Sequence, residues 1–141
     1  MAFLPYLFFG GNCRQAFTRY QELFGGELTL LSMSDVPGEA PPPPEQADMI
    51  IHAAIKVGDD LLMGSDDPTD PSFGPVKGMM VSYDAADVDD AKSKFGALSE
   101  GGSVSQELIP TFFSQAFGMC TDRFGTPWMI VGPEGDQGAS A

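Results

Sequence analysis

Apolar and polar positions follow the same order in the two halves of this chain. In the first half, the apolar run PYLFF and two glycines precede a segment from Asn12 to Leu23 whose apolar residues recur at helical spacing. In the second half, the run MMVSY precedes a similar segment from Asp87 to Leu98. Because Asn12 and Leu23 have the same spacing as Asp87 and Leu98, the pattern indicates an internal repeat.

Each half then continues with segments that are typical of strands. Runs of β-branched and other apolar residues, separated by glycine turns, predict strands at residues 4–9, 27–33, 49–57, 61–64, 79–83, 104–108, 112–120 and 128–131. The resulting order is strand, helix and three strands, and it occurs twice. This order predicts an α+β fold rather than alternating βαβ units.

Proline, glycine and small polar residues mark the connections and the C-terminal end. Residues 34–47 contain PGEAPPPPEQ, which excludes a regular helix or strand because proline lacks an N–H donor and fixes its own φ. We interpret this segment as a surface loop, with a lid over a pocket and a dimer contact as alternatives. We interpret residues 1–132 as one domain of two modules, about 3–66 and 78–132, and predict a flexible tail at 133–141.

Composition and charge exclude several classes of partner. The formal net charge of −13, with 7 basic residues, opposes binding to nucleic acid and to anionic membranes. The sequence has no apolar stretch near the roughly 20 residues of a membrane helix, and its N-terminus lacks the basic region of a secretory signal. Cys13 and Cys120 form no CxxC motif and are interpreted as reduced thiols, with a disulfide as the alternative. We therefore expect a cytoplasmic protein.

Three segments resemble the vicinal oxygen chelate superfamily, which includes glyoxalase I, the bleomycin resistance proteins and the extradiol dioxygenases. They are YLFFGGNCRQAFTRYQELFGGEL, HAAIKVGDDLLMGSD and DRFGTPWMI, and they occur in the order of its PhnB-like branch. The resemblance implies paired βαβββ modules that curl their sheets into a cup-shaped cavity, and it implies a homodimer. Some PhnB-like proteins are described as ubiquinone methyltransferases, but this chain has no glycine-rich loop after a strand to hold S-adenosylmethionine.

The metal site of the superfamily requires four inward-facing His, Gln or Glu side chains, and the resemblance assigns other residues to these positions. Counting from the helix starts and turn glycines gives Pro5, Leu62, Met80 and Met129. A shift by one residue gives Tyr6, Met63, Met79 and either Trp128 or Ile130. None of these side chains is a histidine or a carboxylate, and a thioether favours copper(I) over a hard divalent ion. We therefore expect no catalytic metal and no other cofactor.

One histidine and several aromatic residues are the candidates for a binding site. His52 lies in the predicted strand 49–57 and is interpreted as a general base or a hydrogen-bond anchor in the cavity, with a half-buried structural histidine as the alternative. The residues predicted to contact a flat or apolar ligand are Phe8, His52, Phe113, Phe117 and Trp128. For the aromatic residues, packing in the core is the alternative.

The leading functional hypothesis is a metal-free protein that binds a small apolar or aromatic molecule in its cavity. The alternative is an enzyme, a lyase, isomerase or dioxygenase-like member of the superfamily, that uses a metal through other ligands or His52 without a metal. A third hypothesis is a dimeric structural or interaction module. Metal analysis of the purified protein distinguishes the first two.

Overall fold

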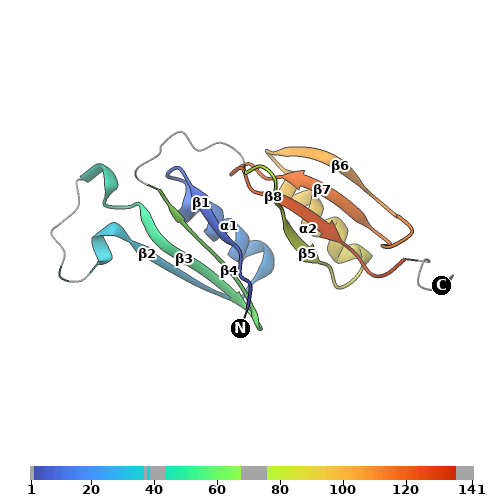
Figure 1. The fold of residues 1–141 in the computed structure, drawn as a ribbon, viewed down its shortest axis with the longest axis horizontal. Coiled ribbons are helices and arrows are strands. Elements are labelled where there is room, and N and C mark those ends of the chain that lie inside the picture. The colour runs from blue at the N-terminus through green and yellow to red at the C-terminus, as the bar shows by residue number, and fades with distance from the viewer. Residues whose placement is uncertain (1, 37, 39–43, 68–75, 136–141) are drawn as a thin grey trace. The chain divides into compact units, whose positions relative to one another are not determined.

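The computed structural model describes residues 2–36, 38, 44–67 and 76–135. The chain divides into two compact units, Met1–Phe73 and Gly74–Ala141, each with one long helix and one sheet (Figure 1). The elements of the first unit are β1 Tyr6–Phe9, α1 Cys13–Phe24, β2 Glu27–Ser32, η1 Met33–Asp35, η2 Pro44–Gln46, β3 Ile50–Val57 and β4 Asp60–Asp66. Those of the second are β5 Val81–Asp84, α2 Val88–Ser99, β6 Ser103–Ile109, β7 Phe117–Thr121 and β8 Pro127–Val131.

The two units share one topology. The strand order is β1-β4-β3-β2 in the first sheet and β5-β8-β7-β6 in the second. In both, the strand before the helix pairs in parallel with the last strand, and the other neighbours are antiparallel. Each helix begins directly after its predicted first residue, Asn12 or Asp87. These features confirm the α+β fold and the internal repeat.

Each helix covers one face of its own sheet (Figure 1). Successive residues of a strand point to opposite faces, and in β1 Leu7 and Phe9 are buried whereas Tyr6 and Phe8 are exposed. The ring of Phe9 lies 6.0 Å from that of Phe17 in α1, so the buried residues of β1 face the helix. The buried residues of α1 are Cys13, Ala16, Phe17 and Tyr20. The face of the sheet that carries Tyr6 and Phe8 is therefore the one opposite the helix.

A glycine in the first sheet makes room for a large side chain of its helix. Gly64 of β4 lies opposite Leu7 of β1. A Cβ atom at Gly64 would lie 2.8 Å from the ring of Phe17, so this ring occupies the space above the glycine. The helix α1 therefore packs closely on β4 at this point.

Several predicted boundaries change in the structure. The strand β4 extends to Asp66, two residues beyond its predicted end, and β7 begins at Phe117 rather than at residue 112. Phe112 and Phe113 lie instead in a turn where the Thr111 N–H donates to the Ser114 carbonyl at 2.8 Å. This turn ends the pairing with β6, so the predicted strand at 112–120 was too long.

The described parts of the proline-rich segment 34–47 contain two short 3-10 helices, η1 and η2. The prediction that this segment has no regular structure is wrong at these two points. Its ends are held together because the Met33 N–H donates to the Met49 carbonyl at 2.9 Å. Residues 37 and 39–43, on which the lid and dimer-contact alternatives depend, lie outside the described residues.

The described start of the C-terminal tail pairs with the second unit. Glu134 forms an isolated antiparallel bridge with Ser114, and the Gln115 N–H donates to the Pro133 carbonyl at 2.7 Å. The first two residues of the predicted tail therefore have backbone partners, and residues 136–141 lie outside the described residues. Within the described residues, none of the helices has the length and hydropathy needed to cross a membrane.

Candidate functional site

The face of the first sheet opposite α1 carries exposed apolar and aromatic side chains. Residues that pair directly across strands share a face, which places Met63 beside Tyr6, and Leu31 beside His52. Phe8, Leu31 and Tyr6 remain 53%, 38% and 37% exposed. We call these five residues, Tyr6, Phe8, Leu31, His52 and Met63, the open face of the first sheet. A contiguous group of exposed apolar residues is typical of a surface that binds another molecule.

A hydrogen bond gives this open face a polar centre. The Tyr6 hydroxyl lies 3.3 Å from His52 Nδ1, and the two rings are 5.9 Å apart. When the imidazole is neutral and carries its proton on Nε2, the Tyr6 O–H donates to Nδ1 and the Nε2–H is left to donate elsewhere. Phe8 continues this ring cluster, at 5.3 Å from Tyr6. The arrangement combines flat apolar surfaces with one directed hydrogen-bond donor.

The structure brings together two of the predicted ligand residues and adds a third. Phe8 and His52 belong to one ring cluster, and Tyr6 joins them. Sequence reasoning had considered Tyr6 only as a metal-ligand position. The available signal was their spacing, because residues two apart in a strand share a face, and the burial pattern of β1 places Tyr6 and Phe8 on its exposed side.

The side chains on these strands do not fit the metal site of the vicinal oxygen chelate superfamily. Tyr6 and Met63 are direct partners on β1 and β4, and Met129 lies on β8. A neutral phenol and thioethers are poor ligands for the hard divalent ions of that chemistry. No group of three or more His, Cys, Asp or Glu residues with metal-binding geometry occurs in the part of the chain that the structure describes. We therefore derive no metal-dependent step for this chain.

Phe113 and Phe117 also meet, in the second unit. Their rings are 5.0 Å apart with an edge-to-face geometry, and Phe112 contacts Phe113 at 5.3 Å. Phe117 pairs with Val131 on β8, on the face opposite to that of Ile130, which is fully buried. Phe117 therefore lies on the face of the second sheet opposite α2.

Trp128 lies in the core instead of on a cavity wall. Only 2% of the residue is exposed, and its Nε1–H donates to Asp122 Oδ2 at 2.9 Å. Asp122 also accepts N–H bonds from Phe124 and Thr126, so its buried carboxylate holds the turn before β8. The indole belongs to the helix-facing side of the sheet, as its partner Cys120 does. Core packing, the alternative interpretation, therefore describes the position of Trp128 in this structure.

Asp66 has a role that the sequence analysis did not predict. The residue is buried, and its Oδ1 accepts the N–H groups of Gly11 and Cys13 at 2.9 and 3.0 Å. Its Oδ2 accepts the Ile50 N–H at 2.9 Å. Asp66 thus caps α1 from a distant strand, whereas Asn12 makes no side-chain capping bond. The sequence signal for this role was a carboxylate directly after the buried residues of β4, because a buried carboxylate requires hydrogen-bond donors.

The donors that Asp66 occupies are those that a cofactor phosphate or carboxylate would need. The segment Gly10-Gly11 joins β1 to α1, and N–H groups at such a helix start commonly bind anions. Here an internal carboxylate already accepts two of them. This part of the first unit therefore does not fit the carboxylate of S-adenosylmethionine.

The two cysteines are unsuited to nucleophilic chemistry. Both are free thiols, and both are buried. Burial raises the pKa of Cys13 to about 12, with a further contribution from the Asp66 charge. Burial likewise raises the pKa of Cys120 to about 11, with a further contribution from Asp122. At neutral pH neither thiol supplies the thiolate that a nucleophile requires.

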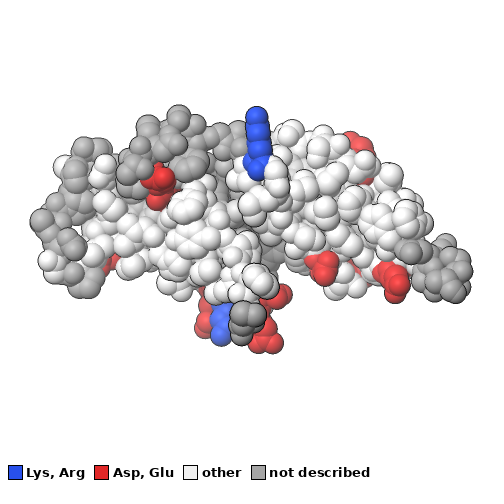
Figure 2. Space-filling model, in the orientation of Figure 1, with Lys and Arg blue, Asp and Glu red and all other residues white. Residues whose placement is uncertain are grey.

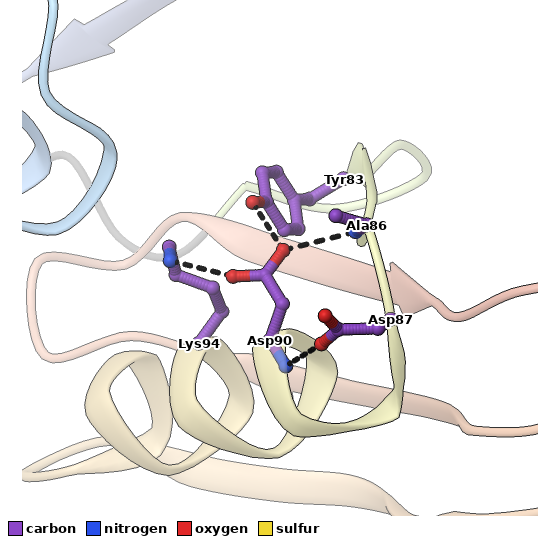
Figure 3. A network of polar contacts seen from close by, with 5 residues as sticks. All are labelled: Tyr83, Ala86, Asp87, Asp90 and Lys94. Carbon is purple, nitrogen blue, oxygen red and sulfur yellow. Dashed lines mark hydrogen bonds and ion pairs between the residues drawn. The ribbon is translucent and has the colours of Figure 1, made fainter.

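A second polar cluster joins α2 to its sheet (Figure 3). Asp90 accepts hydrogen bonds from the Tyr83 hydroxyl at 2.7 Å, Lys94 Nζ at 2.8 Å and the Ala86 N–H at 3.1 Å. The Lys94 contact is the main cause that lowers the pKa of Asp90, and burial is the main cause that raises the pKa of Tyr83 to about 12. Asp87 caps the helix by accepting the Asp90 N–H at 2.7 Å. Every named group has a partner within the cluster, which indicates a structural role.

The topology defines a protein of the glyoxalase/bleomycin-resistance fold. A structure described as a glyoxalase/bleomycin resistance protein/dioxygenase family enzyme from Burkholderia phytofirmans covers 93% of this chain and 98% of its own, with a TM-score of 0.62 and 14% identity. At this level of identity the likeness concerns the fold alone. The vicinal oxygen chelate resemblance is thereby confirmed for the fold.

The chain belongs to the 3-demethylubiquinone-9 3-methyltransferase family, whose model matches residues 1–131. Protein YjdN of Escherichia coli is 31% identical over 92% of this chain and 94% of its own length. The crystal structure of PA1353 from Pseudomonas aeruginosa is 42% identical, covers 94% of this chain and 97% of its own, and has a TM-score of 0.84. A structure described as a putative 3-demethylubiquinone-9 3-methyltransferase, PhnB protein, from Bacillus cereus is 21% identical. It covers 94% of this chain and 100% of its own, with a TM-score of 0.75. The PhnB-like assignment is thereby confirmed.

Proposed function

We propose that this protein binds a small, flat, apolar or aromatic molecule that carries a hydrogen-bond acceptor, without a metal ion. The observation that supports this proposal is the Tyr6–His52 hydrogen bond among the exposed rings of the open face of the first sheet. The rings of Tyr6 and Phe8 supply apolar contact area. The imidazole Nε2–H supplies one directed donor, which favours a carbonyl or ether oxygen on the ligand.

The family description is consistent with a ligand of this class. It names demethylubiquinone, a flat ring with carbonyl oxygens. A methyltransferase also needs a site for its cofactor. The start of α1 does not offer one, because Asp66 already accepts the N–H groups there. Binding without methyl transfer therefore agrees better with the described residues than a methyltransferase reaction does.

A matched pair of ligands tests this function. The probes are 2-acetylnaphthalene and 2-ethylnaphthalene, which have the same ring and nearly the same shape but differ in one carbonyl oxygen. We expect equilibrium dialysis to show about fivefold tighter binding of the ketone, because one net hydrogen bond contributes about 1 kcal/mol. Equal affinities for the two probes, or no binding of either, would contradict the proposal.

Variants of the open face and a matched control locate the interaction. His52→Phe keeps a ring but removes the donor, so it should abolish the preference for the ketone. Phe8→Ser should weaken the binding of both probes. Phe3→Ser is the control, because Phe3 is 94% exposed and precedes β1. A ketone preference that persists in His52→Phe, or equal losses in Phe8→Ser and Phe3→Ser, would count against this site.

We further propose that the chain forms a homodimer and acts in the cytoplasm. Support for self-association comes from the large exposed apolar residues on the sheet faces opposite the helices, among them Phe8 and Ile109. A second copy of the chain would cover the parts of these faces that a small ligand leaves exposed. Sedimentation velocity at micromolar concentration should give the mass of two chains, and a single-chain mass would refute the dimer. Two free thiols agree with a reducing compartment.

A further inference from the structure

A row of paired residues crosses the second sheet and carries a charge at one end. The register places Asp84 of β5 beside Val131 of β8, Val131 beside Phe117 of β7, and Phe117 beside Ile109 of β6. Paired residues share a face, so this row lies on the face opposite α2. Neighbouring strands are about 4.8 Å apart, so the backbone of Asp84 lies about 10 Å from that of Phe117.

The orientation of Asp84 follows from its neighbour on the strand. Tyr83 faces α2, because its hydroxyl donates to Asp90 on that helix (Figure 3). Consecutive strand residues point to opposite faces, and Asp84 is accordingly exposed. The carboxylate therefore stands at the edge of the same face as Phe117.

Packing and hydrogen bonds hold the aromatic end of the row in place. Phe113 packs edge-to-face on Phe117 and remains 39% exposed. The turn that presents it is held by the Ser114 hydroxyl, which donates to the carbonyls of Ala116 and Gly132 at 2.9 and 3.1 Å. A preformed aromatic wall binds without the cost of ordering a loop.

The charge on this sheet selects the sign of the ligand. The four strands read VSYD, SVSQELI, FGMCT and PWMIV, so their charged residues are Asp84 and Glu107, and none is basic. The formal net charge of the chain is −13, and acidic side chains outnumber basic ones on the face drawn in Figure 2. This field raises the local concentration of cations and lowers that of anions.

We infer that the row from Asp84 to Ile109 binds a small organic cation, an amine with an aromatic or aliphatic body. The ammonium pairs with the Asp84 carboxylate, and the body lies over Val131 and Phe117 against Phe113. The backbone spacing of about 10 Å between Asp84 and Phe117 suits a molecule of one or two rings. This inference concerns the second sheet alone and does not rest on the function proposed for the first.

Two ligands that differ in charge test the inference. The probes are 2-naphthylmethylammonium and neutral 2-naphthylmethanol at pH 7, measured by equilibrium dialysis at low salt. We expect the ammonium to bind about fivefold more tightly than the alcohol, the magnitude of one partly exposed ion pair. Equal binding of the two probes, or no binding of the ammonium, would overturn the inference.

Two charge-matched variants separate a local contact from the general field. Asp84→Asn and Asp89→Asn each change the net charge by the same amount, but Asp89 lies in the first turn of α2. Asp84→Asn should remove the preference for the ammonium, and Asp89→Asn should retain it. Equal effects of the two variants would show attraction by net charge only and would also overturn the inference. Asp84→Asn should still bind 2-acetylnaphthalene more tightly than 2-ethylnaphthalene, the preference that tests the first sheet. Failure of one proposal can therefore be distinguished from failure of the other.

Discussion

At the scale of single residues, the same local task is carried out by different side chains in the two units. Asp87 caps its own helix, whereas the start of α1 is capped by Asp66 from the end of β4. Asn12, the predicted first residue of α1, occupies the N-cap position without using its side chain. Sequence spacing locates a helix start but does not show a carboxylate that reaches it from a strand 53 residues away.

Replacing each capping aspartate by asparagine should have unequal effects on stability. Asp66→Asn puts an amide N–H₂ against buried N–H donors, and we expect it to lower the free energy of unfolding by about 2–3 kcal/mol. Asp87→Asn is the matched control, since asparagine caps an exposed helix as well as aspartate does, and the change should stay within about 0.5 kcal/mol. Urea unfolding followed by Trp128 fluorescence measures both. A loss in Asp66→Asn no larger than that in Asp87→Asn would show that the three bonds to Asp66 contribute little.

At the scale of elements, local pattern predicted the strands and helices well and their ends less well. The helix starts and the positions of β2, β3, β6 and β8 follow from apolar periodicity and glycine turns. The start of β7 does not follow from the local pattern. Phe112 and Phe113 have the strand preference of aromatic residues, but a turn between Thr111 and Ser114 ends the pairing before β7. The burial of Trp128 was not evident from the sequence for a related reason, since alternation shows that a residue lies on one face of a strand but not which face the helix covers.

Two glycine-to-alanine changes test how tightly each element is packed. A Cβ atom at Gly64 would lie 2.7 Å from the Leu7 carbonyl oxygen and 2.8 Å from the Phe17 ring, so Gly64→Ala should cost about 1–3 kcal/mol. A Cβ atom at Gly96, within α2, meets nothing within 4 Å, and Gly96→Ala should stabilise the protein by about 0.5–1 kcal/mol. Thermal unfolding measures both changes. If both variants melted at the same temperature, the close packing of α1 on β4 would be refuted.

At the scale of the whole molecule, repetition and charge are the basis of the two binding proposals. Each unit covers one sheet face with a helix, and the opposite face carries both aromatic side chains and a polar group. In the first unit the polar group is a tyrosine–histidine pair, and in the second it is a carboxylate. Composition alone predicted that nucleic acid is not a partner, and the resemblance identified the fold. The Tyr6–His52 pair required the structure, because it joins side chains from two strands that are 46 residues apart in the sequence.

The most direct test of the central claim is to locate a bound ligand on the protein by NMR. Intermolecular nuclear Overhauser effects between unlabelled 2-acetylnaphthalene and uniformly ¹³C-labelled protein report which side chains contact the probe. The account predicts contacts to the rings of Tyr6, Phe8 and His52, and their loss in Phe8→Ser. Contacts confined to residues outside the open face of the first sheet would contradict it.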